Sequence, residues 1–177
     1  KIDVKGKIID LSPRDAFSSA EFIPGCESLI LTVSDIATPP SYTMLGSSGK
    51  KIRDIGNNNE YMGRYAGLPE KKFITVNSDG NLLNGYVILP PGFRESQKYP
   101  VIMWQYSGPG SQEVLNCWSL DWEYFAAKEG FIVACVDGRG TGSRGREFET
   151  CVYRMRPSTS LMRQDTWRHC LTWMPTA

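Results

Sequence analysis

The chain has 177 residues, which is enough for one ordinary domain or for parts of two. Hydrophobic residues make up 41% and charged residues 22%, a mixture typical of globular rather than intrinsically disordered proteins. The net charge of +1 gives no bulk electrostatic reason to expect binding to nucleic acid or to an anionic membrane. The apolar runs are short and none resembles a signal peptide, so we expect no membrane segment and no targeting signal.

The five cysteines are odd in number and scattered, with no Cys-x-x-Cys pair and no Cys/His ligand spacing. We therefore expect no metal site, no cofactor and no disulfide framework. Cys135 lies inside an apolar run, which favours a small buried side chain.

Residues 1–70 carry short alternating segments separated by turn residues. Residues 27–34 and 41–45 predict strands, and a Gly/Ser turn then leads into another strand at 51–53. Short strands at regular spacing are typical of antiparallel repeats such as propeller blades. One such set cannot bury its own face, so the pattern predicts the end of a larger array, and a small independent β-meander is the alternative.

From residue 71 onward the pattern changes. Residues 73–76 and 83–89 predict the two strands of a hairpin, because the Asp-Gly dipeptide between them favours a tight turn. The Pro-Pro-Gly sequence at 90–92 ends the second strand, since proline cannot donate to a central ladder.

A strand, a helix and a second strand follow. Residues 101–105 predict a strand buried on both faces, and residues 131–136 predict another. Between them, residues 120–128 predict a helix. Its expected apolar face is made by Trp122, Phe125 and Ala126. This order implies a βαβ unit and the start of an α/β sheet.

Four stretches within this region, at 88–93, 98–101, 106–112 and 136–145, occur in an order and at a spacing that resemble a known family. The last of them contains Asp-Gly-Arg-Gly-Thr-Gly after a buried strand. Together they resemble the opening of the catalytic domain in dipeptidyl peptidase IV-like serine peptidases of the prolyl oligopeptidase family. The β-rich part before residue 71 is similar to the last propeller blade that precedes this domain.

The resemblance implies a mixed α and β fold class that is incomplete. Residues 1–70 would be the C-terminal end of a β-propeller, and residues 71–153 would be the first strands and helix of an α/β-hydrolase domain. Such peptidases release N-terminal dipeptides, preferring Pro or Ala as the second residue, so the implied partner is a peptide substrate. Family members are often periplasmic, secreted or at the cell surface.

The resemblance assigns a catalytic role to Tyr106, as the oxyanion-hole tyrosine whose phenol donates to the tetrahedral intermediate. The alternative is that Tyr106 only packs at a strand end, as many aromatic residues do. The other matched feature is a structural loop made by Asp137, Gly138, Arg139 and Gly140. Its spacing fits neither dinucleotide-binding nor Walker motifs, so we expect the glycines to allow a tight crossing and Arg139 to bind Asp137 or backbone carbonyls.

The other catalytic groups of the family are absent from the sequence. Its chemistry needs a Gly-x-Ser-x-Gly nucleophile elbow, then an Asp and finally a His. No such elbow occurs, and the one histidine, His169, precedes any nucleophile. We therefore expect this chain by itself to be inactive.

Residues 154–177 show no helical or strand period and do not continue the resemblance. Read in another frame from the last base of the Gln164 codon, permitted codons yield an L-P-Y-V-D sequence, as the family carries before its elbow. The hypothesis is a frameshifted or non-family tail, and a natural divergent C-terminus is the alternative.

Two further functions stay open. The chain could be a non-catalytic β-rich interaction module that presents a sheet edge to a partner, or a hydrolase that takes its triad from another chain. We also expect the strand at 131–136 to form an exposed apolar edge of the incomplete sheet, through which the chain self-associates.

Overall fold

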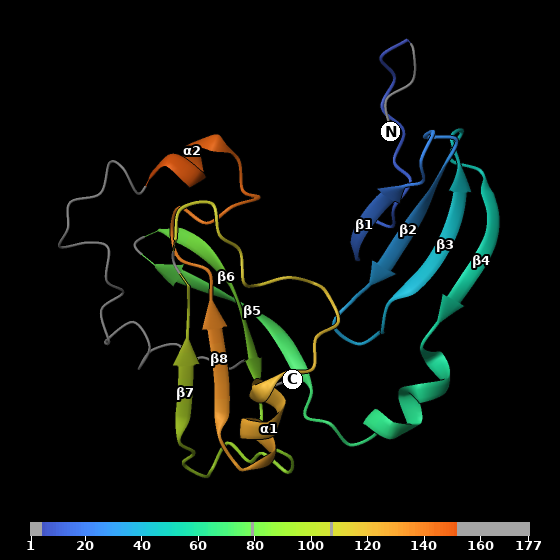
Figure 1. Ribbon diagram of the computed structural model, residues 1–177. Coiled ribbons are helices and arrows are strands. Elements are labelled where there is room, and N and C mark those ends of the chain that lie inside the picture. The colour runs from blue at the N-terminus through green and yellow to red at the C-terminus, as the bar shows by residue number, and fades with distance from the viewer. Residues whose placement is uncertain (1–4, 79, 107, 152–177) are drawn as a thin grey trace. The chain divides into compact units, whose positions relative to one another are not determined.

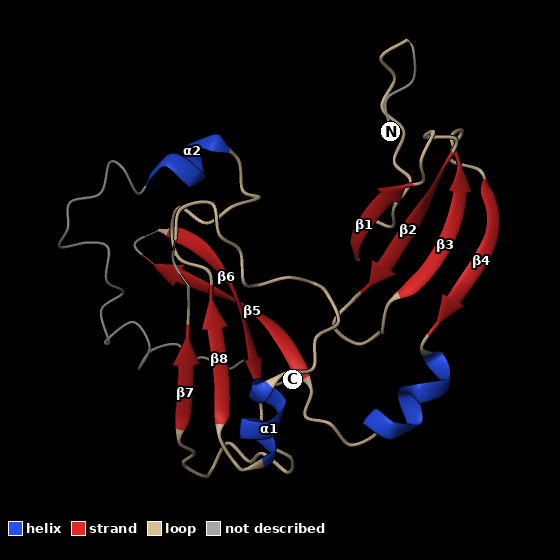
Figure 2. Ribbon diagram, in the orientation of Figure 1, coloured by secondary structure: helices blue, strands red, loops and turns tan. Residues whose placement is uncertain are grey.

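The computed structural model describes residues 5–78, 80–106 and 108–151, and the chain forms two compact units (Figure 1). The first unit comprises Lys1–Leu68 with Leu115–Asp121, and the second comprises Pro69–Val114 with Trp122–Ala177. Each contains a four-stranded sheet, and the described helices are short (Figure 2). The prediction of a mixed α and β fold is confirmed.

The sheet of the first unit is an antiparallel meander in the order β1-β2-β3-β4. Its strands are β1 (Phe17–Phe22), β2 (Ser28–Ser34), β3 (Ser41–Gly46) and β4 (Lys51–Asn57), and a 3-10 helix follows over Asn59–Tyr65. Leu29 and Leu31 of β2 form a small core with Leu45 of β3, against which Leu11 and Val33 pack. The spacing of two between the β2 residues reflects the side-chain alternation of a strand.

Asn116 fastens the returning segment Leu115–Asp121 to this sheet. Its carbonyl accepts the Phe17 N–H at 3.1 Å, and its side-chain oxygen accepts the Ile36 N–H at 3.2 Å. Its side-chain amide donates to the Asp15 carbonyl at 2.8 Å. One side chain thus satisfies backbone groups on two separate segments, a connection that no local sequence pattern predicts.

The sheet of the second unit has the order β5-β6-β8-β7. Its elements are β5 (Lys71–Ser78), β6 (Asn81–Ile88), β7 (Val101–Trp104), α1 (Trp122–Lys128), β8 (Ile132–Val136) and α2 (Arg146–Thr150). Strands β5 and β6 form the expected antiparallel hairpin. Strands β7 and β8 are parallel and are joined through α1, so the predicted βαβ unit is confirmed.

The expectation that residues 131–136 form the edge of this sheet is wrong. β8 is an interior strand, because β6 pairs with one side of it and β7 with the other, and all five of its residues are buried. In the described sheet the edge next to β8 is β7, where Val101 is 41% exposed, so the expectation that residues 101–105 are buried on both faces is wrong as well.

The expected apolar face of α1 also differs from the observed one. Ala126 is buried, but Trp122 and Phe125 are 44% and 69% exposed. The buried side carries Glu123 and Ala127 instead. A carboxylate tolerates such a position only where charged and hydrogen-bonding partners surround it, and Glu123 has them.

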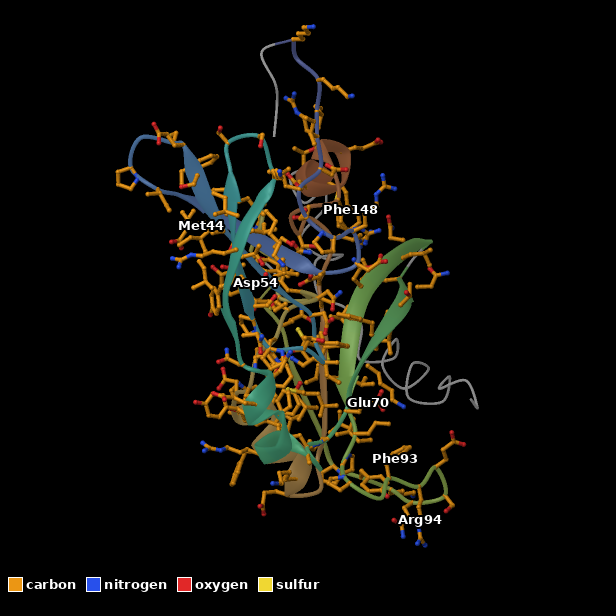
Figure 3. All side chains as sticks on the ribbon, turned by 90° about the vertical axis from the view of Figure 1, so that its right-hand side faces the viewer. Met44, Asp54, Glu70, Phe93, Arg94 and Phe148 are labelled. Atoms are coloured by element: carbon orange, nitrogen blue, oxygen red, sulfur yellow. The ribbon has the colours of Figure 1, made fainter. Side chains whose placement is uncertain are left out.

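One hydrophobic cluster of the second unit joins segments that lie far apart in the sequence. Val76 of β5, Leu83 of β6 and Val136 of β8 are almost fully buried, and Ile74 and Phe148 pack against them. Phe148 comes from the short helix α2 (Figure 3). The end of β8 is therefore held in a packed environment at the point where the Gly-rich loop begins.

Candidate functional site

Tyr106 lies two residues beyond the end of β7, at the carboxyl end of a strand that runs parallel to β8. Its side chain is 63% exposed. The ring lies against Gly108, where an added Cβ would stand 2.9 Å from the Tyr106 Cε1 and 3.3 Å from its phenolic oxygen. A side chain at position 108 would therefore displace the ring, and the carboxyl edge of a parallel pair is where α/β sheets place functional groups.

Ser111 closes the turn that carries Tyr106. Its Oγ lies 3.0 Å from the Tyr106 carbonyl oxygen and 2.6 Å from the Gly108 carbonyl oxygen, so one hydroxyl donor serves both. Its backbone N–H donates to the same Gly108 carbonyl at 3.1 Å. The backbone at Tyr106 is thus bound to a residue five positions later.

The Gly-rich loop after β8 interlocks with this turn. The Gly110 N–H donates to the Gly140 carbonyl at 3.1 Å, and the Gly142 N–H donates to the Ser111 carbonyl at 2.8 Å. A Cβ at Gly142 would lie 2.7 Å from the Gly110 carbonyl oxygen, closer than real Cβ atoms approach. The glycine at 142 therefore permits a close backbone contact between the two loops, as expected for a tight crossing.

Asp137 is the buried anchor of this arrangement, with 4% exposure. Its two carboxylate oxygens accept the N–H groups of Glu113, at 2.9 Å, and Val114, at 3.1 Å. Its own N–H donates to the Asn84 carbonyl of β6 at 2.9 Å. Hydrogen bonds to a charged acceptor are stronger than neutral ones. The expected bond from Arg139 stays a prediction.

Thr141 stabilises the Gly-rich loop from within. Its side chain is almost fully buried, and its hydroxyl donates to the Gly138 carbonyl at 2.9 Å. Gly140 has a φ of 90°, in the left-handed region that favours glycine. The loop is therefore fixed by its own turn as well as by its contacts with residues 110–114.

A second buried polar cluster, which the sequence did not predict, surrounds Glu123 of α1. The Lys71 Nζ lies 3.1 Å from one carboxylate oxygen. The other oxygen accepts the Trp104 Nε1–H at 2.7 Å and the Tyr86 hydroxyl. Burial, and then the bond to Glu123, hold the pKa of Tyr86 far above its usual range. This cluster links β5, β6, β7 and α1 just before the turn of Tyr106.

Cys135 lies beside this cluster and is fully buried, as its apolar surroundings predicted. Burial raises the pKa of its thiol to about 12. A thiol in this state carries almost no thiolate near neutral pH, and the thiolate is the reactive form. Cys135 is therefore a packing residue.

His169 and the tail at 154–177 lie outside the described residues. Among the residues that the structure does describe, no helix is both long and apolar enough to cross a membrane. Within the same residues, no three His, Cys, Asp or Glu side chains gather in a way that could hold a metal ion.

No protein-family model matches the chain, but individual curated proteins do. The probable dipeptidyl-aminopeptidase B of Pyrenophora teres f. teres is 36% identical over 143 residues, which are 78% of this chain and 16% of that protein. The protein of the same name from Phaeosphaeria nodorum is 49% identical over 88 residues, which are 49% of this chain and 10% of that protein. The chain thus spans only a small part of the length of these relatives.

Solved structures agree with these matches. Porphyromonas gingivalis dipeptidyl peptidase 4 is 38% identical, with a TM-score of 0.77 over 85% of this chain and 22% of that one. Pyrococcus horikoshii acylaminoacyl peptidase, at 19% identity and a TM-score of 0.61, shares the fold over 81% of this chain and 22% of that one. Over the segment that it shares with these proteins, the resemblance of the chain to dipeptidyl peptidase IV-like serine peptidases of the prolyl oligopeptidase family is confirmed.

Proposed function

We propose that this chain contributes the oxyanion-binding side of the catalytic centre in a serine-type dipeptidyl peptidase. Its substrates would be peptides from which an N-terminal dipeptide with Pro or Ala in second position is released. The observation that carries the proposal is the exposed phenol of Tyr106 at the carboxyl end of β7, in a turn bound by Ser111.

The proposed chemistry needs a donor at this place. When a serine attacks the scissile carbonyl, its oxygen becomes negatively charged in the tetrahedral intermediate. A hydrogen-bond donor aimed at that position stabilises the transition state more than the substrate, and so it accelerates the reaction. The Tyr106 O–H is such a donor, and a preformed turn keeps the cost of orienting it low.

For the organisation of the chain, we propose that residues 1–70 are the end of a β-propeller and that residues 71–153 begin an α/β-hydrolase domain. An antiparallel four-stranded meander is the unit from which propeller blades are built, which supports the first assignment. We propose that residues 154–177 are a frameshifted tail. The 177 residues contain no Gly-x-Ser-x-Gly elbow, and so the chain alone would not hydrolyse peptides.

The proposal is tested by transplanting residues 69–151 into Porphyromonas gingivalis dipeptidyl peptidase 4 in place of the matching segment. The recipient keeps its own nucleophile, so the chimera is expected to release p-nitroaniline from Gly-Pro-p-nitroanilide. The 177-residue chain alone is expected to release none. A chimera that melts cooperatively but is inactive would contradict the proposal, as would turnover by the isolated chain that survives repurification.

A further inference from the structure

We propose that Asp137 and Ser111 are positioning residues for Tyr106. The buried Asp137 carboxylate binds the backbone at residues 113 and 114, and the Ser111 hydroxyl binds the Tyr106 carbonyl. The inference rests on the proposed role of Tyr106 for its catalytic meaning. Its structural part, that these two side chains set the position of the ring, stands on the contacts of the second unit alone.

The restraint begins at the interior strand of the sheet. Asp137 directly follows β8, whose residues are all buried and paired on both sides. The Asp137 N–H donates to the Asn84 carbonyl of β6, and this bond fixes the backbone from which the carboxylate extends. Each carboxylate oxygen accepts one N–H, from Glu113 and from Val114, and this fixes the end of the segment that follows Tyr106.

Further hydrogen bonds hold the turn between Tyr106 and Ser111. Gly110 and Ser111 are bound to the Gly-rich loop through the carbonyl of Gly140 and the N–H of Gly142. Ser111 lies one step from Tyr106, because its hydroxyl bridges the Tyr106 and Gly108 carbonyls. The Asp137 carboxylate and the Ser111 hydroxyl therefore lie on one path of hydrogen bonds and backbone segments that leads from β8 to Tyr106.

The exposure of Tyr106 makes this support necessary. Tyr106 is 63% exposed, so its ring is not fixed by burial, although it lies close to Gly108. An oxyanion donor that is misplaced by about 1 Å loses much of its effect, because catalysis depends on geometry established before the reaction. Residues that hold the turn would therefore set the rate without touching the substrate.

The Asp137→Asn substitution keeps the size and shape of the side chain but removes its negative charge and one of its two acceptor oxygens. An amide has one acceptor oxygen and places an NH₂ group where the second N–H now donates, so Asp137→Asn leaves one of the two N–H groups without its partner. Ser111→Ala removes the hydroxyl bridge, and Ser111→Thr keeps it. Ile88→Ala is the matched control, because it weakens the core of the same unit beside Val133, at the opposite end of the β6–β8 pairing from Val136.

The experiment uses the full 177-residue protein and solution NMR. In the unsubstituted protein we expect nuclear Overhauser contacts between the Tyr106 ring and the Gly108 α-protons, and slow exchange of the Glu113 and Val114 amides. Asp137→Asn is expected to speed exchange of these amides at least tenfold and to abolish the ring contacts. Ser111→Ala abolishes the ring contacts, Ser111→Thr retains them, and Ile88→Ala retains both the ring contacts and the slow amide exchange.

Two results would overturn the inference: ring contacts that persist in both Asp137→Asn and Ser111→Ala, or contacts that vanish equally in Ile88→Ala. If Asp137→Asn does not fold, the comparison of the Ser111 variants decides.

In the chimera, Asp137→Asn should lower kcat with KM nearly unchanged. It should have little further effect on kcat in a Tyr106→Phe background, since both changes act through one group. If the NMR results are as expected but Tyr106→Phe leaves the kcat of the chimera unaltered, the proposed function is refuted and the positioning role stands.

Discussion

The Lys71 ammonium lies 3.1 Å from the Glu123 carboxylate, and the two side chains are only 6% and 5% exposed. Lys71 also lies over the Tyr86 ring, 4.2 Å from its centre. Because both side chains are buried, the attraction between the two charges is weakly screened, and removing either charge takes away a strong interaction inside the protein. This pair is therefore a structural bond between β5 and α1 rather than a surface interaction.

Glu123→Gln should destabilise the protein by about 3–5 kcal/mol, because the buried Lys71 ammonium would lose the carboxylate charge that lies 3.1 Å away. The matched control is Glu70→Gln, which breaks the neighbouring pair Lys72–Glu70 (Figure 3). That pair is solvent-exposed, with side chains 53% and 75% accessible, so its loss should cost less than about 1 kcal/mol. Urea unfolding of both variants is the measurement, and equal small losses would show that the buried pair contributes nothing special.

Stability should fall at alkaline pH, partly through Cys135. The pKa of its thiol rises from 9.0 to about 12 in the folded protein, mainly because the side chain is buried. Between these two values the unfolded chain has released the proton and the folded chain still holds it. The free energy of unfolding therefore decreases as pH rises through this window, by at most about 1.4 kcal/mol per pH unit for one group.

The Cys135→Ala variant removes this contribution, and it leaves in place burial and the bond to Glu123, the two largest causes of the raised pKa of Tyr86. Its free energy of unfolding should decline less steeply than that of the unsubstituted protein between pH 9 and 11, whatever its stability at pH 7. Urea titrations at several pH values measure both slopes. Parallel slopes would contradict the account of Cys135.

Gly85 of β6 should not tolerate even a methyl group. A Cβ there would lie 2.8 Å from the Cys135 carbonyl oxygen and 2.8 Å from the Val136 Cγ2, and a backbone atom in a paired strand cannot move aside cheaply. Gly85→Ala should therefore lower stability by about 1–3 kcal/mol through overpacking. Gly56→Ala in β4 is the control, because nothing lies within 4 Å of its Cβ position, and its unfolding midpoint should shift little. Similar midpoints for the two variants would mean that β6 and β8 separate more easily than their packing suggests.

Much of the local structure was predictable from the sequence. The strands at 27–34, 41–45 and 131–136 were recognised because alternation or a continuous apolar run is a local property. The hairpin was recognised because its turn has a specific dipeptide. The order of the strands in the second sheet could not be predicted from the sequence, because the pairing of β8 with β6 joins residues about 50 positions apart.

The candidate site shows the same division. Tyr106 and the Gly-rich loop were singled out through their resemblance to a family, but the hydrogen bonds between residues 110–114 and 137–142 could not be read from either segment alone. Glu123 was missed entirely, since it lies outside the apolar face expected from Trp122, Phe125 and Ala126, and a carboxylate is most often exposed to solvent. Its buried partner, Lys71, lies 52 positions away. Long-range pairing of polar groups is what the sequence did not predict.

The central claim, that Tyr106 donates to the oxyanion, is tested most directly by kcat and KM of the chimera and of its Tyr106→Phe variant with Gly-Pro-p-nitroanilide. Phenylalanine keeps the ring and removes only the donor. The account predicts a roughly hundredfold to thousandfold fall in kcat, or about 3–4 kcal/mol of lost transition-state stabilisation, with KM nearly unchanged. A fall in kcat of less than about threefold, which is under about 0.7 kcal/mol, would contradict the claim and leave Tyr106 as an exposed packing residue.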